Sequence, residues 1–337
     1  MKEMTSATIL DVGHGNCAIL TAEYTVVVDA GRGSALLEFL TEQGIDRVDT
    51  VLVSHSDADH LGGLIALLSA RVAEVGSVYL NSDALQSSRV WADMTYELDQ
   101  LQRSSSLDFR TSLVEGDRFD VGDPAVSIAV VAPRPYLAAI GPGGRDHEGR
   151  RLSGNSMSAV VTVQHGDEIV LMLPGDLDGV GLDHLAATHP EIEADVLVFP
   201  HHGGNAARSS SVRANAEFAE RLAHLVRPST VVFSIGRSSH GNPRPEVVDA
   251  VRAVVPDVRI ACTQLSEHCA AEVPAVAPTH LLEVFAAGRD RRRCCAGTIT
   301  IDLGIALEPR PSRDAHEAFV RAATSTPLCM RRANLGL

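Results

Sequence analysis

The sequence predicts an α/β protein whose mixed β-sheets are covered by helices. Short β-branched strands occur in groups with helical segments between them, and two pairs of apolar runs, at 119–132 and 157–173, are spaced as hairpins. The run from Asp49 to Ser54 is apolar without a polar alternation, as in a strand that is covered on both faces. The hairpins favour mixed sheets over a purely parallel, doubly wound sheet.

The predicted elements follow one another along the chain. Strands are expected at 5–12, 18–21, 25–29, 49–54, 76–81, within 119–132, at 157–164, 168–173, 195–199, 230–235, 257–262 and 298–303. Helical spacing occurs at 34–43, 61–68, 84–102, 181–188, 213–226, 245–254 and 315–323. Residues 133–155 are rich in Gly, Pro and Arg, which predicts a long loop of the kind that often forms a lid. We expect one domain over 1–308 and a peripheral tail over 309–337.

Composition limits the class of protein. The chain has 337 residues, 45% of them hydrophobic, and a formal net charge of −14, so its whole surface is not expected to adhere to DNA or anionic lipid. Its apolar runs are too short to span a membrane, and the N-terminus lacks the apolar region of a signal peptide. These features predict a soluble, cytoplasmic protein. The 6 cysteines are too sparse for a disulfide scaffold.

Potential metal ligands follow the ends of four apolar strands. The stretch His55-Ser-Asp57-Ala-Asp59-His60 comes after the first, Asp176 after the second, His201-His202 after the third and His240 after the fourth. Neighbouring strand ends lie along one edge of a sheet, so this order would gather imidazoles and carboxylates into one site. The number of ligands suits two divalent metal ions that share a bridging water, whose pKa they would lower.

These residues resemble the successive motifs of a known family. Asp11-Val-Gly-His-Gly15, Val28-Asp29-Ala-Gly31, the His55-to-His60 stretch with Gly62-Gly63, Pro174-Gly-Asp176 and His201-His202-Gly203 look like those of the metallo-β-lactamase fold. They are similar, more narrowly, to the hydrolase domain of competence (ComEC) type proteins. The resemblance runs from about Thr5 to Leu303. It implies a four-layer αββα sandwich with a dinuclear metal site at the sheet edge.

The resemblance also implies roles for individual residues. His55 and Asp57 would bind the first metal and Asp59 and His60 the second, while Asp176 would bridge the two and His201 would complete the first site. Asp59, Asp176 and His201 are therefore the expected catalytic residues. Asp57 stands where the familiar zinc members have a histidine, and such a carboxylate makes Mn²⁺ or Mg²⁺ plausible beside Zn²⁺.

The remaining site residues have alternative roles. The last motif reads Ser239-His240-Gly241-Asn242-Pro243 instead of Gly-His-Pro, so His240 is either a metal ligand or a substrate contact. Asn155 and Ser158 belong to a stretch that also resembles a family signature, and they would position the site or bind substrate. His202 is expected to be a hydrogen-bonding neighbour of the ligands, and His14 to form a wall of the cleft; both are candidate substrate-binding residues.

The predicted activity is hydrolysis of a phosphodiester by a metal-bridging hydroxide, with DNA, RNA or a nucleotide as substrate. A small nucleotide or cyclic nucleotide is the alternative that the acidic net charge favours. A redox or thioester-cleaving enzyme of the same fold is a second alternative, which bound iron would support. A non-catalytic binding module is a third, and the nearly complete ligand set argues against it.

Two further clusters have a structural interpretation and an alternative in which they bind a ligand. Cys262, Cys269, Cys294 and Cys295 are expected to be buried thiols, and the alternative is a structural zinc site, although their spacing is not that of a zinc knuckle. The arginine-rich stretch from Arg289 to Arg293 is expected to be a solvated loop, and the alternative is a patch that contacts phosphate.

Overall fold

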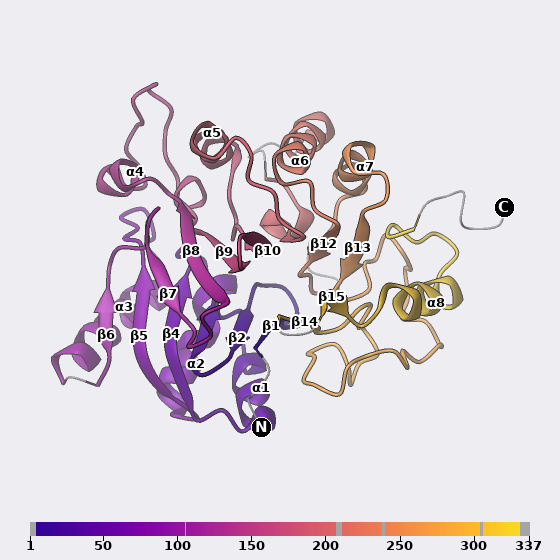
Figure 1. Cartoon of the computed structure of the whole chain (residues 1–337), viewed down its shortest axis with the longest axis horizontal. Helices are drawn as coiled ribbons and strands as arrows, with labels where there is room; N and C mark the ends of the chain where they lie inside the picture. The colour runs from indigo at the N-terminus through magenta and orange to yellow at the C-terminus, as the bar shows by residue number, and fades with distance from the viewer. Residues whose placement is uncertain (1–4, 105, 207–210, 238–239, 304–305, 331–337) are drawn as a thin grey trace.

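Two β-sheets face each other, and helices cover the outer face of each one (Figure 1). The structure is a computed structural model, and it describes residues 5–104, 106–206, 211–237, 240–303 and 306–330. One sheet has 8 strands in the order β15-β14-β1-β2-β3-β4-β5-β6, and the other has 7 in the order β13-β12-β11-β10-β9-β8-β7. The predicted four-layer αββα sandwich is thereby confirmed.

The strands of the first sheet are β1 (Ser6–Ile9), β2 (Ala18–Thr21), β3 (Thr25–Val28), β4 (Arg47–Val53), β5 (Glu74–Leu80), β6 (Asp108–Arg110), β14 (Ile299–Asp302) and β15 (Ala306–Arg310). Those of the second are β7 (Arg118–Asp120), β8 (Val126–Ala132), β9 (Val160–His165), β10 (Glu168–Leu173), β11 (Val196–Val198), β12 (Thr230–Phe233) and β13 (Arg259–Cys262). The helices are α1 (Ala35–Gln43), α2 (Ala58–Ala70), α3 (Arg89–Arg103), α4 (Pro135–Ile140), α5 (Gly179–Thr188), α6 (Val212–Val226), α7 (Pro245–Val254) and α8 (Arg313–Ala323), with short 3₁₀ turns at Asn155–Met157 and Pro200–Gly203.

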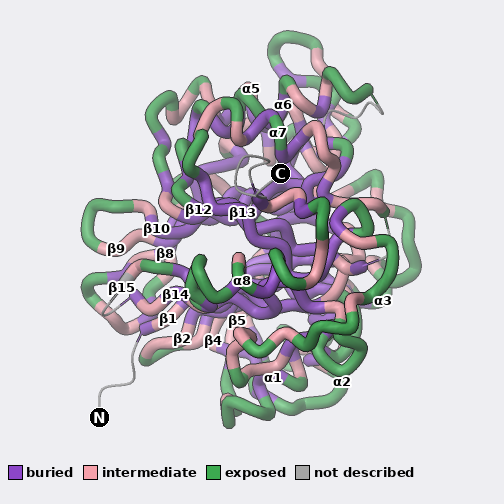
Figure 2. The backbone as a smooth tube through the Cα atoms, turned by 90° about the vertical axis from the view of Figure 1, so that its right-hand side faces the viewer, coloured by how far each residue is buried: buried purple, intermediate pink, exposed green. Residues whose placement is uncertain are grey.

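The alternation of side chains along each strand divides the core into layers. In β3, Val26 and Val28 point between the sheets, whereas Val27 points toward α1 and α2. In β4, Leu52 faces the other sheet while Val51 and Val53 face the helices, so this strand is covered on both sides as its apolar run predicts. Figure 2 shows the buried residues concentrated in the two middle layers.

The helices bury one apolar face each against the outer side of a sheet. Leu36 and Leu40 of α1 and Leu64 of α2 pack on the first sheet, and Phe218 and Leu222 of α6 pack on the second. Such an i, i+4 spacing places the two residues on the same face of a helix. In Figures 1 and 2, α5, α6 and α7 lie over the second sheet, on the side of the molecule opposite α1.

Several elements differ from the expectation. The stretch 133–155, expected to be a loop, contains α4, and β6 and β15 were not expected. β15 spans the expected domain boundary at 308/309 and pairs with β14. Beyond it, Phe319 and Val320 of α8 pack into the core under the second sheet, and the Arg259 side chain donates hydrogen bonds to the carbonyls of Pro309 and Pro311. Within the described residues, no helix is long and apolar enough to cross a membrane.

Candidate metal centre

The turn between β4 and α2 carries the densest group of ligands. β4 ends at Val53 and α2 begins at Ala58, so His55 and Asp57 lie on the connecting turn while Asp59 and His60 lie in the first helical turn. Asp57 is the N-cap residue, but no side-chain capping bond is found for it among the described residues. Its carboxylate is 48% exposed and lies at the mouth of the site, 3.5 Å from His55 Nε2 and within 3.3 Å of Gln86 Nε2.

Three buried side chains form the first trio of potential ligands. One nitrogen of His55, one of His60 and one carboxylate oxygen of Asp176 all lie within 4.8 Å of one another. His60 Nε2 is 3.2 Å from Asp176 Oδ1, and His55 Nε2 is 4.0 Å from Asp176 Oδ2. Asp176 follows β10 in the second sheet, so this trio bridges the two sheets at their common edge.

Asp29 fixes the orientation of this trio from beneath. It follows β3, which runs parallel to β4 with Val28 opposite Leu52. Asp29 accepts hydrogen bonds from the Ser54 backbone N–H at 2.7 Å and the Ser54 hydroxyl at 2.8 Å, and its Oδ2 lies 2.7 Å from His60 Nδ1. A carboxylate in this position holds the proton on Nδ1 and leaves Nε2 free to bind a metal. The motif Val28-Asp29-Ala-Gly31 is recognisable in the sequence, but its spacing does not predict this role for Asp29.

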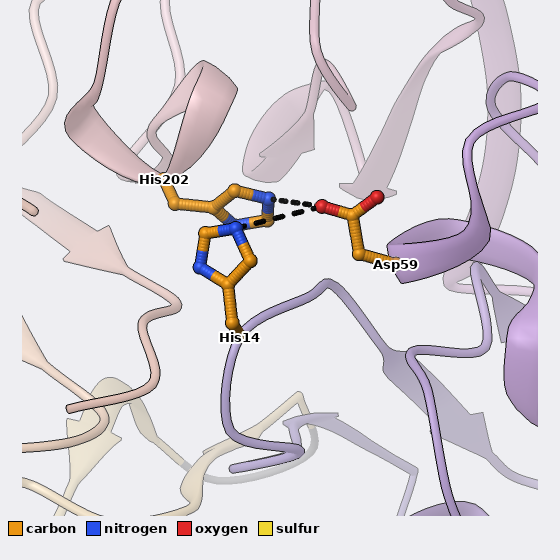
Figure 3. A group of neighbouring side chains, drawn as sticks. All are labelled: His14, Asp59 and His202. Atoms are coloured by element: carbon orange, nitrogen blue, oxygen red, sulfur yellow. Dashed lines mark ion pairs between the residues drawn. The ribbon is translucent and has the colours of Figure 1, made fainter. Parts of the chain in front are cut away.

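A second trio consists of His14, Asp59 and His202 (Figure 3). Asp59 Oδ2 lies 3.4 Å from His202 Nε2 and 3.6 Å from His14 Nε2. The other ring nitrogen of His202, Nδ1, is 2.8 Å from the Ser234 carbonyl oxygen, which orients the ring. His202 Nε2 is also 3.8 Å from Asp176 Oδ1, so Asp176 adjoins both trios.

Asp176 is held in place by the buried hydroxyl of Ser158 and by His201, which belongs to the next motif along the chain. Its backbone N–H donates to the Ser158 hydroxyl at 3.1 Å, and that hydroxyl donates to the Pro174 carbonyl at 3.1 Å. Ser158 is fully buried, so its geometry favours the positioning role over the substrate contact. The His201 backbone N–H donates to Asp176 Oδ1 at 3.1 Å, and His201 Nδ1 lies 3.3 Å from Oδ2.

Several buried imidazole nitrogens of the site have no hydrogen-bond partner among the described residues. They are Nε2 of His55, His60, His201 and His202, together with Nδ1 of His14, whose Nε2 is the nitrogen that faces Asp59. Because an unpaired buried polar atom is costly, such a cluster calls for a group that the nitrogens can bind. Imidazole and carboxylate donors suit Zn²⁺ or Mn²⁺, so the residues present fit a divalent metal site.

The charges of the site agree with this fit. Burial alone would raise the pKa of Asp176, but the charges of His201, His60 and His202 lower that pKa well below its ordinary value. The pKa of Asp59 is also lowered, because the hydrogen bond to His202 and the charge of His60 outweigh its burial. The pKa of His14 falls to about 4 through burial and the neighbouring His202 and His240. At neutral pH Asp59 and Asp176 are thus ionised and His14 is neutral, which are the states that bind metal. Against the effect of burial, the charges of Asp29 and Asp176 raise the pKa of His60, so a metal ion would displace a proton from this ring.

The remaining predicted residues lie at the edge of the site or away from it. His240 is exposed, and its ring contacts the His14 ring at a tilt of 40°, with centroids 4.3 Å apart. Asn155 is half-buried in the 3₁₀ turn that precedes Ser158. Cys294 Sγ lies 3.5 Å from Asp11 Oδ2, whereas Cys295 Sγ lies 3.2 Å from His316 Nε2. The potential metal-ligand trios found in the described part of the chain contain no cysteine, so the favoured interpretation as buried thiols fits better than a zinc site.

A model of the metallo-beta-lactamase superfamily matches residues 10–218. The chain is 25% identical over 225 residues to ComE operon protein 3 of Bacillus subtilis (strain 168), and 25% identical over 255 residues to competence protein ComA of Neisseria gonorrhoeae. These alignments cover 64% and 74% of this chain but 24% and 30% of the two relatives, so the chain spans about a quarter to a third of their length. Among solved structures, the metallo-beta-lactamase fold protein YhfI from Bacillus subtilis aligns with 76% of this chain and 96% of its own, at 12% identity and a TM-score of 0.46.

Proposed function

Because the chain belongs to the metallo-beta-lactamase superfamily, we propose that it is a metal-dependent hydrolase that cleaves phosphodiesters. The resemblance predicted from the sequence is confirmed by the family match and by the likeness to two competence proteins. The observation that supports the proposal best is the pair of ligand trios built on Asp59 and Asp176, in which Nε2 of His55, His60 and His202 has no hydrogen-bond partner among the described residues.

In this proposal the site holds two divalent ions, Zn²⁺ or Mn²⁺. His55, His60 and Asp176 would hold one ion, and Asp59 and His202 would contribute to the other. Asp176 is the shared carboxylate, because it adjoins both groups. Such a pair of ions supplies hydroxide at neutral pH and polarises a phosphoryl oxygen.

The side chains around the ligands would orient them and set the access of substrate. Asp29 keeps the proton of His60 on Nδ1, and the Ser158 hydroxyl keeps Asp176 turned toward the histidines. His201 stands beside Asp176 with its side chain 14% exposed, so it faces the entrance more than the deeper His60 does. His201 is therefore the proposed residue for exchanging a proton with the substrate, and Asp57 and His240 line the mouth.

Phosphodiesters are favoured over other hydrolysable bonds because the motifs are similar to those of competence-type proteins, whose hydrolase domains resemble nucleases. The specific substrate is either a nucleic acid or a small nucleotide. The net charge of −14 would repel a long polyanion, and this favours the small-nucleotide alternative. Both substrates belong in the same assay.

The test combines metal analysis with hydrolysis. Protein purified without chelators is analysed for zinc, manganese and iron, and is then assayed with Mn²⁺ on a DNA oligonucleotide, an RNA oligonucleotide and a cyclic dinucleotide. We expect bound zinc or manganese and cleavage of at least one substrate, and the Asp59→Asn/His60→Ala double variant should reduce cleavage to background. Iron as the bound metal, or equal cleavage by the double variant, would contradict the proposal.

A further inference from the structure

We propose that His14 is a direct ligand of the second metal ion and completes the group formed by Asp59 and His202. This inference rests on the proposed function, since it assumes that the site binds divalent ions. In this proposal His14, in the glycine turn after β1, binds the second metal ion. The family pattern would give that position to its last histidine, which is His240 in this chain.

The glycine turn that carries His14 is bonded to the first turn of α2. The Asn16 backbone N–H donates to the Asp59 carbonyl oxygen at 3.2 Å, so the turn is attached to the backbone of a proposed ligand. Gly15 has a φ of +144°, and a Cβ atom there would lie 2.5 Å from the same carbonyl oxygen. The close approach requires glycine next to His14 and brings the His14 ring to the first turn of α2.

Ser234 connects His14 and His202. The Ser234 hydroxyl donates to the Gly15 carbonyl at 2.7 Å, and the Ser234 carbonyl lies 2.8 Å from His202 Nδ1. One buried serine after β12 therefore fixes the His14 turn and the His202 ring at the same time. The two rings lie 4.3 Å apart between their centroids. A wall residue that only shaped the cleft would not need this connection.

The His14 side chain faces Asp59. Nε2 of His14 and Nε2 of His202 both face the same oxygen, Asp59 Oδ2, at 3.6 and 3.4 Å (Figure 3). All three ligand atoms lie within 4.8 Å of one another. Imidazole nitrogens and a carboxylate oxygen are ligand types that suit a divalent ion, and the shared Asp176 adjoins the same group.

The alternative ligand of the second metal ion is His240. His240 is exposed, its ring lies against the His14 ring at a tilt of 40°, and it belongs to neither of the two ligand trios found among the described residues. His14 thus occupies the place between His240 and Asp59. The shift of His240 in the last motif and the presence of His14 in the glycine turn are then explained together, because His14 takes over the ligand position that His240 does not fill.

The experiment measures metal binding instead of activity. Metal-free wild type and the variants His14→Ala, His14→Gln, His14→Glu and His240→Ala are titrated with Co²⁺, which is followed by visible absorption and calorimetry. We expect two equivalents for wild type and His240→Ala. The Ala and Gln variants should bind the second equivalent at least about tenfold more weakly, since even outer partners of metal ligands contribute 10- to 100-fold. Glu has the shape of Gln but is a ligand, so it should restore the second equivalent.

The outcomes separate this inference from the proposed function. A wild type that binds no Co²⁺ would contradict the function. If wild type binds two equivalents and the Gln and Glu variants bind the second ion equally well, or if His240→Ala loses it, the assignment of His14 is wrong while the function stands. Circular dichroism of each metal-free variant checks that the chain has folded, and the comparison of Gln with Glu does not depend on the Ala variant.

Discussion

At the scale of single residues, the site depends on groups that never touch a metal. Asp29 illustrates this, because its two oxygens accept from the backbone and hydroxyl of Ser54 and face His60 Nδ1. The Ser54 hydroxyl in turn lies 3.0 Å from His55 Nδ1, so one buried aspartate orients both imidazoles of the first trio. Its proposed role is to keep the His60 proton on Nδ1. The amide of an asparagine has the same size but can donate to Nδ1 instead, so it would not hold the proton there.

Replacing Asp29 by Asn should therefore weaken metal binding without removing a ligand. The amide NH₂ group would donate to His60 Nδ1 and move the ring proton to Nε2, where it blocks the lone pair. We expect a loss of about 10- to 100-fold in affinity for Mn²⁺ or Zn²⁺, measured by competition with a chelating dye. Asp93→Asn on the exposed face of α3 is the control, and equal affinity of the two variants would show that Asp29 has no such role.

The proposed ligands were predictable from the sequence to different extents. His55, Asp59, His60 and Asp176 each follow an apolar strand closely, and the order of the strands is enough to bring them together. The pairing of His202 with Asp59 depends on the backbone conformation of the turn, where His201 and His202 both have positive φ values. No spacing rule predicts which of the two adjacent rings contacts Asp59 and which contacts Asp176. The role of Asp29 depends on the register of β3 against β4.

At the scale of elements, the site requires that α2 approach the turn after β3 closely. The Gly63 backbone N–H donates to the Ala30 carbonyl at 2.8 Å, and a Cβ atom on Gly63 would lie 2.5 Å from the Gly31 carbonyl oxygen. Because both contacts involve backbone atoms, neither side can yield by a rotamer change. The glycine pair that follows His60 in the motif is thus partly explained by packing.

Gly63→Ala should push α2 away from this turn and lower the free energy of unfolding by about 1–3 kcal/mol, the usual range for overpacking. The matched control is Gly179→Ala at the start of α5, where a Cβ atom would meet no atom within 4 Å. That change should be neutral or stabilise the fold by about 0.4–1 kcal/mol through the unfolded chain. Urea denaturation of both variants decides the point, and equal midpoints would contradict the close-packing argument.

The elements that the sequence did not predict share a physical cause. α4 has 6 residues and β6 has 3, so neither is long enough to show a periodic pattern. β15 exists because it pairs with β14, and its own residues, ALEPR, contain a proline and little β-branching. The long strands and amphipathic helices were predicted because their periodicity reports burial on a defined face.

At the scale of the whole molecule, the C-terminal segment is part of the fold and adds a titratable group to the core. His316 of α8 is 1% exposed, and its Nε2 lies 3.2 Å from Cys295 Sγ. Burial lowers the pKa of His316 to about 3, with smaller contributions from Arg259 and His280. The folded chain therefore keeps this imidazole neutral in a pH range where an unfolded chain, with a pKa near 6.5, would bind a proton.

The stability of the fold should consequently fall as the pH falls below about 6.5. Between about pH 6.5 and 3 the unfolded state binds more protons at this residue, so the free energy of unfolding falls by about 1.4 kcal/mol per pH unit from His316 alone. At pH 5 the loss is about 2 kcal/mol. His316→Gln should remove that part of the difference between pH 7 and pH 5 in urea denaturation, whereas the exposed control His147→Gln should keep it. An unchanged pH dependence in His316→Gln would refute the assignment.

Half of the described non-glycine residues with positive φ lie where the chemistry is proposed. Arg71 and Arg227 close helices and Arg292 lies in a turn away from the site, while Asp29, His201 and His202 have φ values of 60°, 51° and 56° beside the proposed ions. Each such residue costs about 1–2 kcal/mol. Selection for thermal robustness alone would place glycine at these three positions. The side chains that stand there mark a trade of stability for preorganisation, in which folding absorbs the strain and an arriving ion finds its ligands already in place.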